Sequence, residues 1–193
     1  RIVVRPTWEE YTPSEDEIVI DLDPGAAFGT GAHATTAMCL RWLEHVVCPG
    51  MRVYDVGCGS GILAIAASKL GAGEVIAMDY DPVAVSVAEE NIEQNHVTNV
   101  VALQSDLLTV CRGMPPAELI TANIIADIII RLFDQLDQHL ARGGVLLASG
   151  IIDDRIDDVE QAAKEHGFTV LDMTCEKEWA AMIIRRTADL EEV

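Results

Sequence analysis

From residue 51 onward, short runs of apolar and β-branched residues alternate with longer segments whose apolar residues recur at helical spacing. This alternation is typical of a parallel sheet whose strands are joined by crossover helices. Strands are predicted at residues 52–56, 74–79, 100–104, 119–122 and 145–149. The chain has 193 residues, half of them hydrophobic, and can therefore bury the core of one such α/β domain.

The segments around these strands carry helix and turn signals. Asp81 followed by Pro82 is a capping residue before a proline at the first helical position, which predicts a helix that ends near residues 91–95. Further elements are predicted as helices at 34–47, 60–70, 124–139 and 153–166, a short strand at 18–22, and strands at 168–174 and 179–185 joined by a loop at 175–178. The last two strands indicate an antiparallel hairpin. The expected fold is therefore α/β, with a mostly parallel seven-stranded sheet, helices on both faces and a terminal hairpin.

The charge balance limits the partners that the chain can bind. Asp and Glu number 32 against 13 Lys and Arg, which gives a formal net charge of −19. A field of this sign repels phosphate backbones and attracts a basic partner, although the same acidity is equally well explained by solubility. Aromatic residues make up only 5% of the chain, which is poor material for a surface on which bases stack. We therefore expect a basic protein partner and no direct nucleic-acid binding.

The five cysteines are scattered, and the sequence has neither a CxxC pair nor a Cys/His cluster at metal-ligand spacing. No signal peptide opens the sequence, and no apolar run approaches the roughly 20 residues that span a bilayer. We therefore expect reduced thiols, a cytoplasmic location, no metal site and no membrane association.

The strongest functional signal is the D-x-G-x-G-x-G sequence of residues 55–61, where the strand at 52–56 turns into a helix. Glycines such as Gly57 and Gly59 let the backbone approach a ligand where a Cβ would collide, and a helix amino end presents free N–H groups. The spacing differs from the G-x-G-x-x-G motif of dinucleotide sites. Asp79, at the end of the next strand, can accept both hydroxyls of a ribose. Together these features predict a nucleoside site for either S-adenosylmethionine or a dinucleotide.

Residues 23–36 form a glycine-rich, hydroxyl-bearing loop that can fold over a bound cofactor. The loop contains Phe28 and Gly29 and leads into a helix, where Thr35 or Thr36 can serve as the N-cap or offer a hydroxyl to a ligand carboxylate. His33, in the same loop, is expected to make a local hydrogen bond rather than to act as a base.

Two polar residues follow later strands of the predicted sheet. Asp106 lies where it can meet an adenine amine, although a solvated loop aspartate is the more common situation. Asn123 lies at the sheet edge where ligands bind, and its side-chain oxygen can orient an amine, with helix capping as an alternative or additional role. Enzymes that methylate the exocyclic amine of a flipped base carry two prolines and an aromatic residue at the next positions. Ile124 and Ile125 stand in place of the prolines and no aromatic follows, which argues against base flipping.

The segments DPGAAFGTGAHATT, DVGCGSGILAIAA, MDYDPVAV, TANII and EWAAMIIRR together resemble the PrmA family of methyltransferases, over nearly the whole chain. The glycine motif is shared by many methyltransferases, whereas the AFGTG-x-H-x-TT loop combined with ANI is much more diagnostic. The resemblance implies a Rossmann-like class I fold, with S-adenosylmethionine as cofactor and S-adenosylhomocysteine as product.

The resemblance also implies an activity, which is methyl transfer to the α-amine and lysine ε-amines of a large-subunit ribosomal protein. It implies cofactor contacts at Thr36, Gly57, Asp79 and Asn123, and we assign the catalytic role to Asn123. Residues 1–24 would be a linker and short strand that follow an amino-terminal recognition domain absent from this sequence, and residues 25–193 the methyltransferase domain. Two alternatives stay open: an RNA or small-molecule methyltransferase on the same scaffold, and a non-catalytic nucleotide-binding module.

Overall fold

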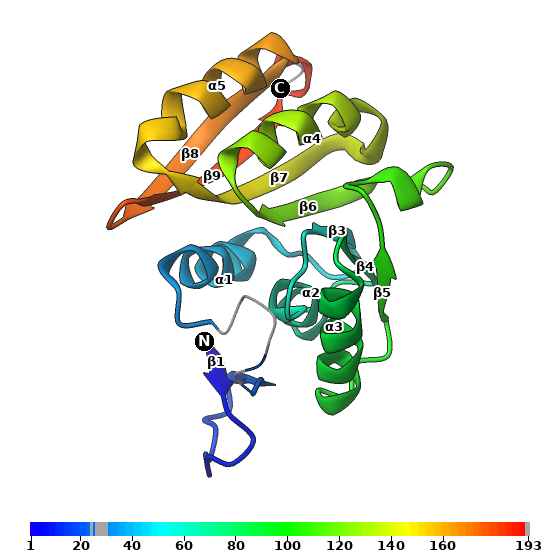
Figure 1. The fold of residues 1–193 in the computed structure, drawn as a ribbon, viewed down its shortest axis with the longest axis vertical. Helices are drawn as coiled ribbons and strands as arrows, with labels where there is room; N and C mark the ends of the chain where they lie inside the picture. Colours follow the sequence, from blue (N-terminus) through cyan, green and yellow to red (C-terminus); the bar gives the residue numbers. More distant parts are fainter. Residues whose placement is uncertain (24, 26–30, 192–193) are drawn as a thin grey trace.

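The computed structural model describes residues 1–23, 25 and 31–191, and these residues build a seven-stranded sheet with the order β5-β4-β3-β6-β7-β9-β8 (Figure 1). The strands are β3 (Arg52–Val56), β4 (Glu74–Asp79), β5 (Val100–Gln104), β6 (Ala117–Asn123), β7 (Leu140–Ile152), β8 (Phe168–Glu176) and β9 (Trp179–Arg186). Strands β3 to β7 pair in parallel, whereas β9 is antiparallel to both β7 and β8. The predicted α/β fold with a terminal antiparallel hairpin is confirmed.

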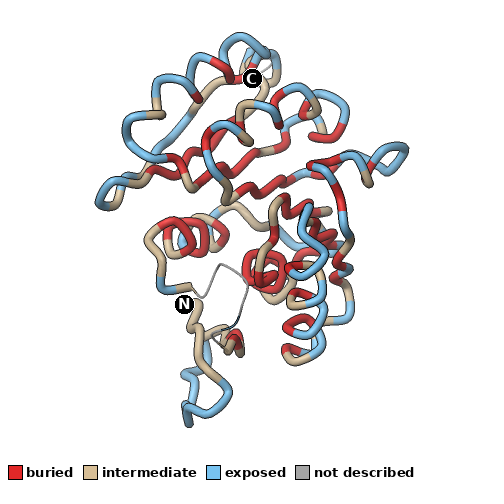
Figure 2. Tube along the Cα trace, viewed as in Figure 1, coloured by how far each residue is buried: buried red, intermediate tan, exposed pale blue. Residues whose placement is uncertain are grey.

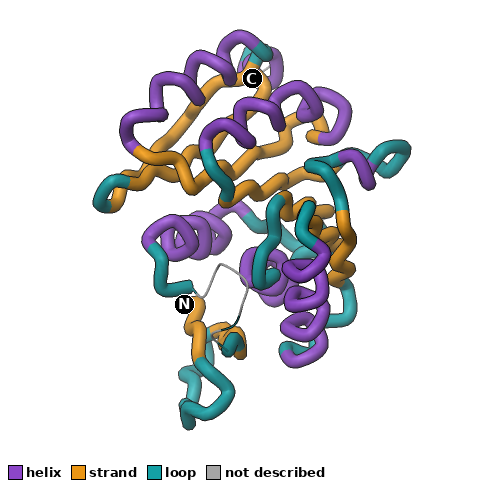
Figure 3. The backbone as a smooth tube through the Cα atoms, viewed as in Figure 1, coloured by secondary structure: helices purple, strands orange, loops and turns teal. Residues whose placement is uncertain are grey.

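Helices cover both faces of this sheet (Figures 1 and 3). The helices are α1 (Ala34–Val46), α2 (Ile62–Lys69), α3 (Pro82–Gln94), α4 (Ala126–His139) and α5 (Ile156–Glu165). Leu43 of α1 and Ile65 of α2 belong to the core cluster on one face, while Phe133 of α4 and Val159 of α5 belong to the cluster on the other. Buried residues are concentrated along the strands and on the helix sides that face them, as Figure 2 shows. Aliphatic packing on both faces thus holds the strands in place.

Three helices begin later than the sequence predicts. Helix α2 begins after Gly61, because that glycine is in the left-handed conformation (φ 82°). Helix α4 begins after Ile125, which is extended (ψ 156°), and α5 follows a separate 3-10 turn at Asp153–Arg155. The predicted start of α3 is confirmed, since the Asp81 carboxylate accepts from the Val83 N–H at 2.9 Å.

Strand lengths also depart from the prediction. β6 and β7 are longer than expected, with a register shift between Ala117 and Leu119 that accommodates the Gly-rich start of β7. In the hairpin only residues 177–178 separate the strands, so the predicted four-residue loop is wrong. Lys177 lies in this tight turn and has a positive φ of 56°. A bulge interrupts the β8–β9 register between Val170 and Asp172.

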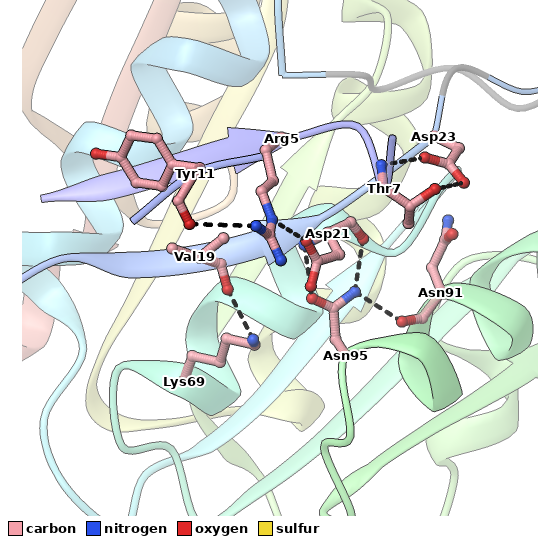
Figure 4. A network of polar contacts seen from close by, with 9 residues as sticks. All are labelled: Arg5, Thr7, Tyr11, Val19, Asp21, Asp23, Lys69, Asn91 and Asn95. Carbon is pink, nitrogen blue, oxygen red and sulfur yellow. Dashed lines mark hydrogen bonds and ion pairs between the residues drawn. The ribbon is translucent and has the colours of Figure 1, made fainter. Parts of the chain in front are cut away.

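The amino-terminal segment forms a separate two-stranded sheet in which β1 (Ile2–Arg5), not predicted, pairs in parallel with β2 (Ile18–Asp21). A network of polar contacts holds this sheet to the main domain (Figure 4). Arg5 Nε contacts the Asp21 carboxylate at 2.5 Å, and Lys69 of α2 donates to the backbone carbonyl of Val19 at 2.7 Å. The interpretation of residues 1–24 as a linker stays a prediction.

Asn95, just after α3, is the centre of this network (Figure 4). Its Oδ1 accepts from the Asp21 N–H, and its Nδ2 donates to the carbonyls of Asp21 and Asn91, all at 2.8 Å. Asn91 in turn donates from Nδ2 to the carbonyl of Ser60 in the glycine motif, also at 2.8 Å. Two buried side-chain amides therefore connect the amino-terminal sheet to the glycine motif.

All five cysteines lie in described parts of the chain and are free thiols. Among the described residues, no helix is both long enough and apolar enough to cross a membrane.

Replacing Asn95 by alanine tests this connection. We expect Asn95→Ala to lower the free energy of unfolding by about 2 kcal/mol, because it removes three side-chain hydrogen bonds, including both that the Asp21 backbone makes with Asn95, whereas the Asn91 carbonyl keeps the N–H of residue 95. Urea denaturation measures the change, and Glu93→Ala, at an exposed position of the same helix, is the matched control. Equal losses for the two variants would show that the three hydrogen bonds contribute nothing.

Candidate functional site

A cavity of about 560 Å³ opens at the carboxyl ends of the central strands, where β3 has β4 on one side and β6 on the other. Such a reversal of strand order is where open α/β sheets bind ligands, and the volume suits a cofactor-sized molecule. Six predicted site residues line the cavity: Thr36, Gly57, Gly59, Asp79, Asp106 and Asn123. Phe28 and Gly29 lie outside the described residues.

The glycine loop is held from two sides. The Cys58 N–H donates to the carbonyl of Met78 at 2.9 Å, which ties the loop to β4. Gly57 has a φ of +67°, and a Cβ on it would collide with Cγ2 of Ile124. Gly57 is therefore required both by its backbone conformation and by the segment that follows β6. The prediction from the sequence had considered only the space needed by a ligand.

Asp79 directs its carboxylate at the same loop. Its Oδ2 accepts from the Gly59 N–H and its Oδ1 from the Asp81 N–H, both at 3.0 Å. A carboxylate has about four acceptor positions, so each oxygen retains capacity for one ligand hydroxyl. The two N–H bonds fix the orientation of the carboxylate at the cavity wall, as a pair of ribose hydroxyls would require.

Asp55, the first residue of the glycine motif, was not singled out from the sequence, yet it lines the cavity and is 1% exposed. Its Oδ1 accepts from the Thr121 hydroxyl at 2.7 Å, while its buried Oδ2 has no hydrogen-bond partner among the described residues. Burial raises the pKa of Asp55 to about 7, and the hydrogen bond from Thr121 opposes this shift. An N–H or O–H donor placed in the cavity would satisfy the unpaired oxygen.

Asn123 ends β6 with its side chain fixed on one side only. Its Nδ2 donates to Thr36 Oγ1 at 3.3 Å, whereas its Oδ1 is buried and has no partner within the described part of the chain. The possible capping role of Asn123 is not observed, because Ile125 is the N-cap residue of α4. The Asn123 amide oxygen is thus available to a ligand N–H.

The helix after the 23–36 loop is capped differently from the prediction. His33, not Thr35 or Thr36, is the N-cap residue of α1, and its Nδ1 lies 3.4 Å from the Thr35 N–H and 2.8 Å from Thr35 Oγ1. The expected local hydrogen bond of His33 is confirmed. Thr36 lies within the first turn, fully buried, with its hydroxyl at the cavity.

The outer wall of the cavity is more exposed. Asp106 has a 56% exposed side chain and lies 3.5 Å from Arg131, so it is a solvated rim residue, as expected for a loop aspartate. The neighbouring Ser105 is buried and donates to the Leu107 carbonyl at 2.8 Å, which leaves it a structural role. Tyr80, which the sequence analysis passed over, is 74% exposed at the cavity wall directly after Asp79.

A second cavity of about 400 Å³ lies on the other side of the segment that ends β6. It is lined by His33, Thr35, Asn123, Ile124, Ile125, Gly150 and Trp179. Asn123 and Ile124 line both cavities, so these two residues form the partition between them. Molecules bound in the two cavities would therefore come closest to each other beside this pair of residues.

Comparison with known proteins gives a consistent assignment. The family model described as Ribosomal protein L11 methyltransferase (PrmA) matches residues 1–187. The ribosomal protein L11 methyltransferase of Caldanaerobacter subterraneus subsp. tengcongensis is 57% identical over 186 residues, which are 96% of this chain and 59% of that protein. The protein of the same name from Heliobacterium modesticaldum is 52% identical over 188 residues, 96% of this chain and 58% of that protein. The chain thus spans less than two thirds of the length of these relatives.

Among solved structures, the ribosomal protein L11 methylase of Lactobacillus delbrueckii subsp. bulgaricus is similar to this chain with a TM-score of 0.89. The two are 38% identical, and the match covers 96% of this chain and 94% of the other. The likeness therefore extends from the sequence to the arrangement of nearly the whole fold.

Substitution of Gly57 tests the contact with Ile124. We expect Gly57→Ala to lower the free energy of unfolding by about 1–3 kcal/mol more than Gly113→Ala does, because only Gly57 lacks room for a Cβ. Both glycines have positive φ, and nothing lies within 4 Å of a Cβ at Gly113. Gly113→Ala therefore measures only the free-energy cost of placing alanine in this backbone conformation, without a collision. Urea denaturation of both variants gives the difference, and equal losses would contradict the predicted collision.

The buried Asp55 carboxyl predicts a pH dependence of stability. Its pKa is raised from an ordinary 3.8 to about 7, so between these values the folded chain keeps a proton that the unfolded chain loses. The stabilisation is complete below pH 3.8 and is lost as the pH rises through about 7, by at most about 1.4 kcal/mol per pH unit.

Denaturation of the cofactor-free protein across this pH range measures the slope. Asp55→Asn should be less steep than the natural chain, whereas Asp157→Asn, at an exposed position of α5, should match it. An unchanged slope in Asp55→Asn would exclude Asp55 as the titrating group.

Proposed function

The chain belongs to the PrmA family of ribosomal protein L11 methyltransferases, and on this premise we propose that it methylates lysine ε-amines and the α-amine of that ribosomal protein, using S-adenosylmethionine. The observation that carries the proposal is the position of the Asn123 amide oxygen. It is buried, lacks a partner among the described residues, and belongs to the wall shared by the two cavities. An amine N–H is the kind of donor that this oxygen requires.

The residues of the larger cavity fit S-adenosylmethionine. Asp79 would bind the ribose hydroxyls, and the N–H groups of the loop at Gly57 and Gly59 would lie along the nucleoside. The unpaired Asp55 Oδ2 and the Thr36 hydroxyl would meet the ammonium and carboxylate of the methionine portion. When bound, this cofactor supplies a methyl group activated by a sulfonium.

Asn123 would orient the acceptor for an in-line displacement. Its Oδ1 accepts one N–H of the neutral amine, which leaves the nitrogen lone pair directed at the methyl carbon. The amine nitrogen would take the methyl group that the cofactor supplies and would then release a proton to solvent. Thr36 holds the Asn123 amide from the other side at 3.3 Å and so fixes which amide atom meets the amine. Alignment of this kind supplies much of the catalysis when little covalent chemistry is required of the protein.

The acceptor must reach the site without its proton. A free lysine has a pKa of about 10.4, and transfer into a cavity with mostly apolar walls disfavours its charged form. Ile124 and Ile125 supply such walls on the acceptor side. Desolvation therefore favours the neutral amine, and we assign no general base.

The charge of the chain supports a protein acceptor over a nucleic acid. The net charge of −19 attracts a basic protein and repels a phosphate backbone. The cytoplasmic location stays a prediction.

The direct test is transfer of a tritiated methyl group to purified ribosomal proteins, with ribosomal RNA as the competing acceptor. Label in ribosomal protein L11 supports the proposal, and label in RNA reverses the choice of acceptor. Calorimetry with S-adenosylmethionine, S-adenosylhomocysteine and NAD is the companion measurement. Binding of NAD alone would identify a nucleotide-binding module instead.

The role of Asn123 predicts a separation of turnover from cofactor affinity. We expect Asn123→Ala to lower kcat by roughly 100-fold, because the oxygen that aligns the amine is removed. The dissociation constant of S-adenosylmethionine should change much less, since the other cavity residues are intact. Asn123→Asp retains an acceptor oxygen and should keep more turnover than Asn123→Ala. Unchanged kcat in Asn123→Ala would refute the assignment.

A further inference from the structure

We infer that the second cavity receives the side chain of the acceptor lysine, and that Trp179 is the residue whose ring packs against the aliphatic stem of that lysine. The inference rests on the proposed function, because it assigns the acceptor side of that same site. It adds a position for the aliphatic chain of the lysine and identifies Trp179 as the aromatic wall that this chain contacts.

The cavity is placed where an acceptor must lie. It meets the larger cavity at Asn123 and Ile124, which line both cavities. An amine that enters from this side reaches the Asn123 amide oxygen at the partition, while the cofactor cavity lies beyond it. Donor and acceptor would then approach from opposite sides, as an in-line displacement requires.

Trp179 forms the wall opposite the partition. It is the first residue of β9, half-buried, and its ring meets the His33 ring edge-on, with 5.2 Å between centroids and 66° between planes. His33 is itself fixed by its contacts with Thr35 at the start of α1. Two segments far apart in sequence thus hold one indole ring in a defined orientation.

Gly150, which lines the cavity, lets β7 approach the backbone of Ile124 closely. A Cβ at this position of β7 would lie 2.6 Å from the carbonyl oxygen of Ile124 and 3.1 Å from its nitrogen. The backbone φ of +82° also favours glycine. The glycine therefore lets the strand lie directly against the backbone that positions Asn123.

The lining matches the chemistry of a lysine side chain. Ile125, 62% exposed, is apolar and adjoins solvent, and Trp179 offers an aromatic face. A four-carbon stem packs against such surfaces while its polar end seeks a hydrogen bond, and Asn123 Oδ1 supplies that acceptor at the inner end. An aromatic face also attracts a cation on its way in.

The charges next to this cavity fit a basic substrate. Glu178, exposed in the hairpin turn, directly precedes Trp179. Its carbonyl accepts from the Asp153 N–H at 2.9 Å, which brings a second exposed carboxylate close to the turn. A lysine-rich segment approaching Trp179 would therefore meet negative charge.

The test compares Trp179→Ala and Trp179→Phe with the natural chain in methyl transfer to ribosomal protein L11. We expect Trp179→Ala to raise KM about tenfold, and Trp179→Phe to restore most of the loss, because a phenyl ring retains an apolar aromatic wall. The dissociation constant of S-adenosylmethionine should be unchanged in both. Trp8→Ala, which removes a 65% exposed indole far along the chain, is the matched control.

An NMR titration provides a readout independent of turnover. The indole N–H resonance of Trp179, assigned by its loss in Trp179→Phe, is followed in the presence of S-adenosylhomocysteine. N-acetyl-lysine methylamide should shift this resonance, and the norleucine analogue, which has no amine, should shift it less.

The outcomes separate the two claims. Methyl transfer to L11 with unchanged KM in Trp179→Ala and no shift of the indole resonance would overturn this inference while the proposed function stands. If the natural chain transfers no methyl group to L11, the proposed function fails, and the titration still decides whether the cavity takes an aliphatic amine.

Discussion

The packing of Ile124 against Gly57 is the contact on which the rest of the site depends. A side chain from the segment after β6 occupies the space that a Cβ on the glycine loop would need. The loop can therefore adopt its turn only with β6 in register beside β3, and Asn123 takes its position from the same segment. Because Ile124 also lines both cavities, one interlocking contact sets the shape of the donor side and the acceptor side together.

Two buried side-chain oxygen atoms, Asp55 Oδ2 and Asn123 Oδ1, have no hydrogen-bond partner in the part of the chain that the structure describes. Each unsatisfied buried acceptor costs about 1–3 kcal/mol, and native proteins keep few of them. Both oxygens belong to residues that line the larger cavity. The arrangement is what a ligand-binding protein needs, because donors on the cofactor and on the acceptor amine would satisfy these two oxygens and so stabilise the bound state.

Sequence patterns predicted the parts of the site that are local. The strands β3 and β4, the glycine motif and Asp79 follow from composition and spacing within short windows, since strand ends in a parallel sheet share one edge. The capping of α1 was missed because the polar side chains of His33, Thr35 and Thr36 compete for one position, and His33 occupies it through its contact with Thr35. The burial of Asp55 depends on contacts distant in sequence, such as that with Thr121 of β6, and leaves no signal in its own neighbourhood.

Long-range contacts explain the other omissions. Trp179 reaches His33 only because β9 inserts between β7 and β8, and no local pattern encodes that strand order. β1 was missed because its sequence, IVVR, is only four residues long and its partner β2 lies further along the chain. In the sequence, Asn91 and Asn95 indicate only the end of a helix. In the structure, their side-chain amides connect the amino-terminal sheet to the glycine motif.

The bulge in β8 has a consequence for self-association. β8 is an edge strand of the main sheet, and open edges recruit strands from other molecules. At the bulge the Asp172 carboxylate accepts from the Met173 N–H at 2.8 Å, so this backbone donor is already occupied within its own chain. A strand from another molecule would find the backbone hydrogen-bonding pattern of β8 interrupted at the bulge, with the Met173 N–H already bonded to the Asp172 carboxylate. This interruption protects the molecule against edge-to-edge aggregation.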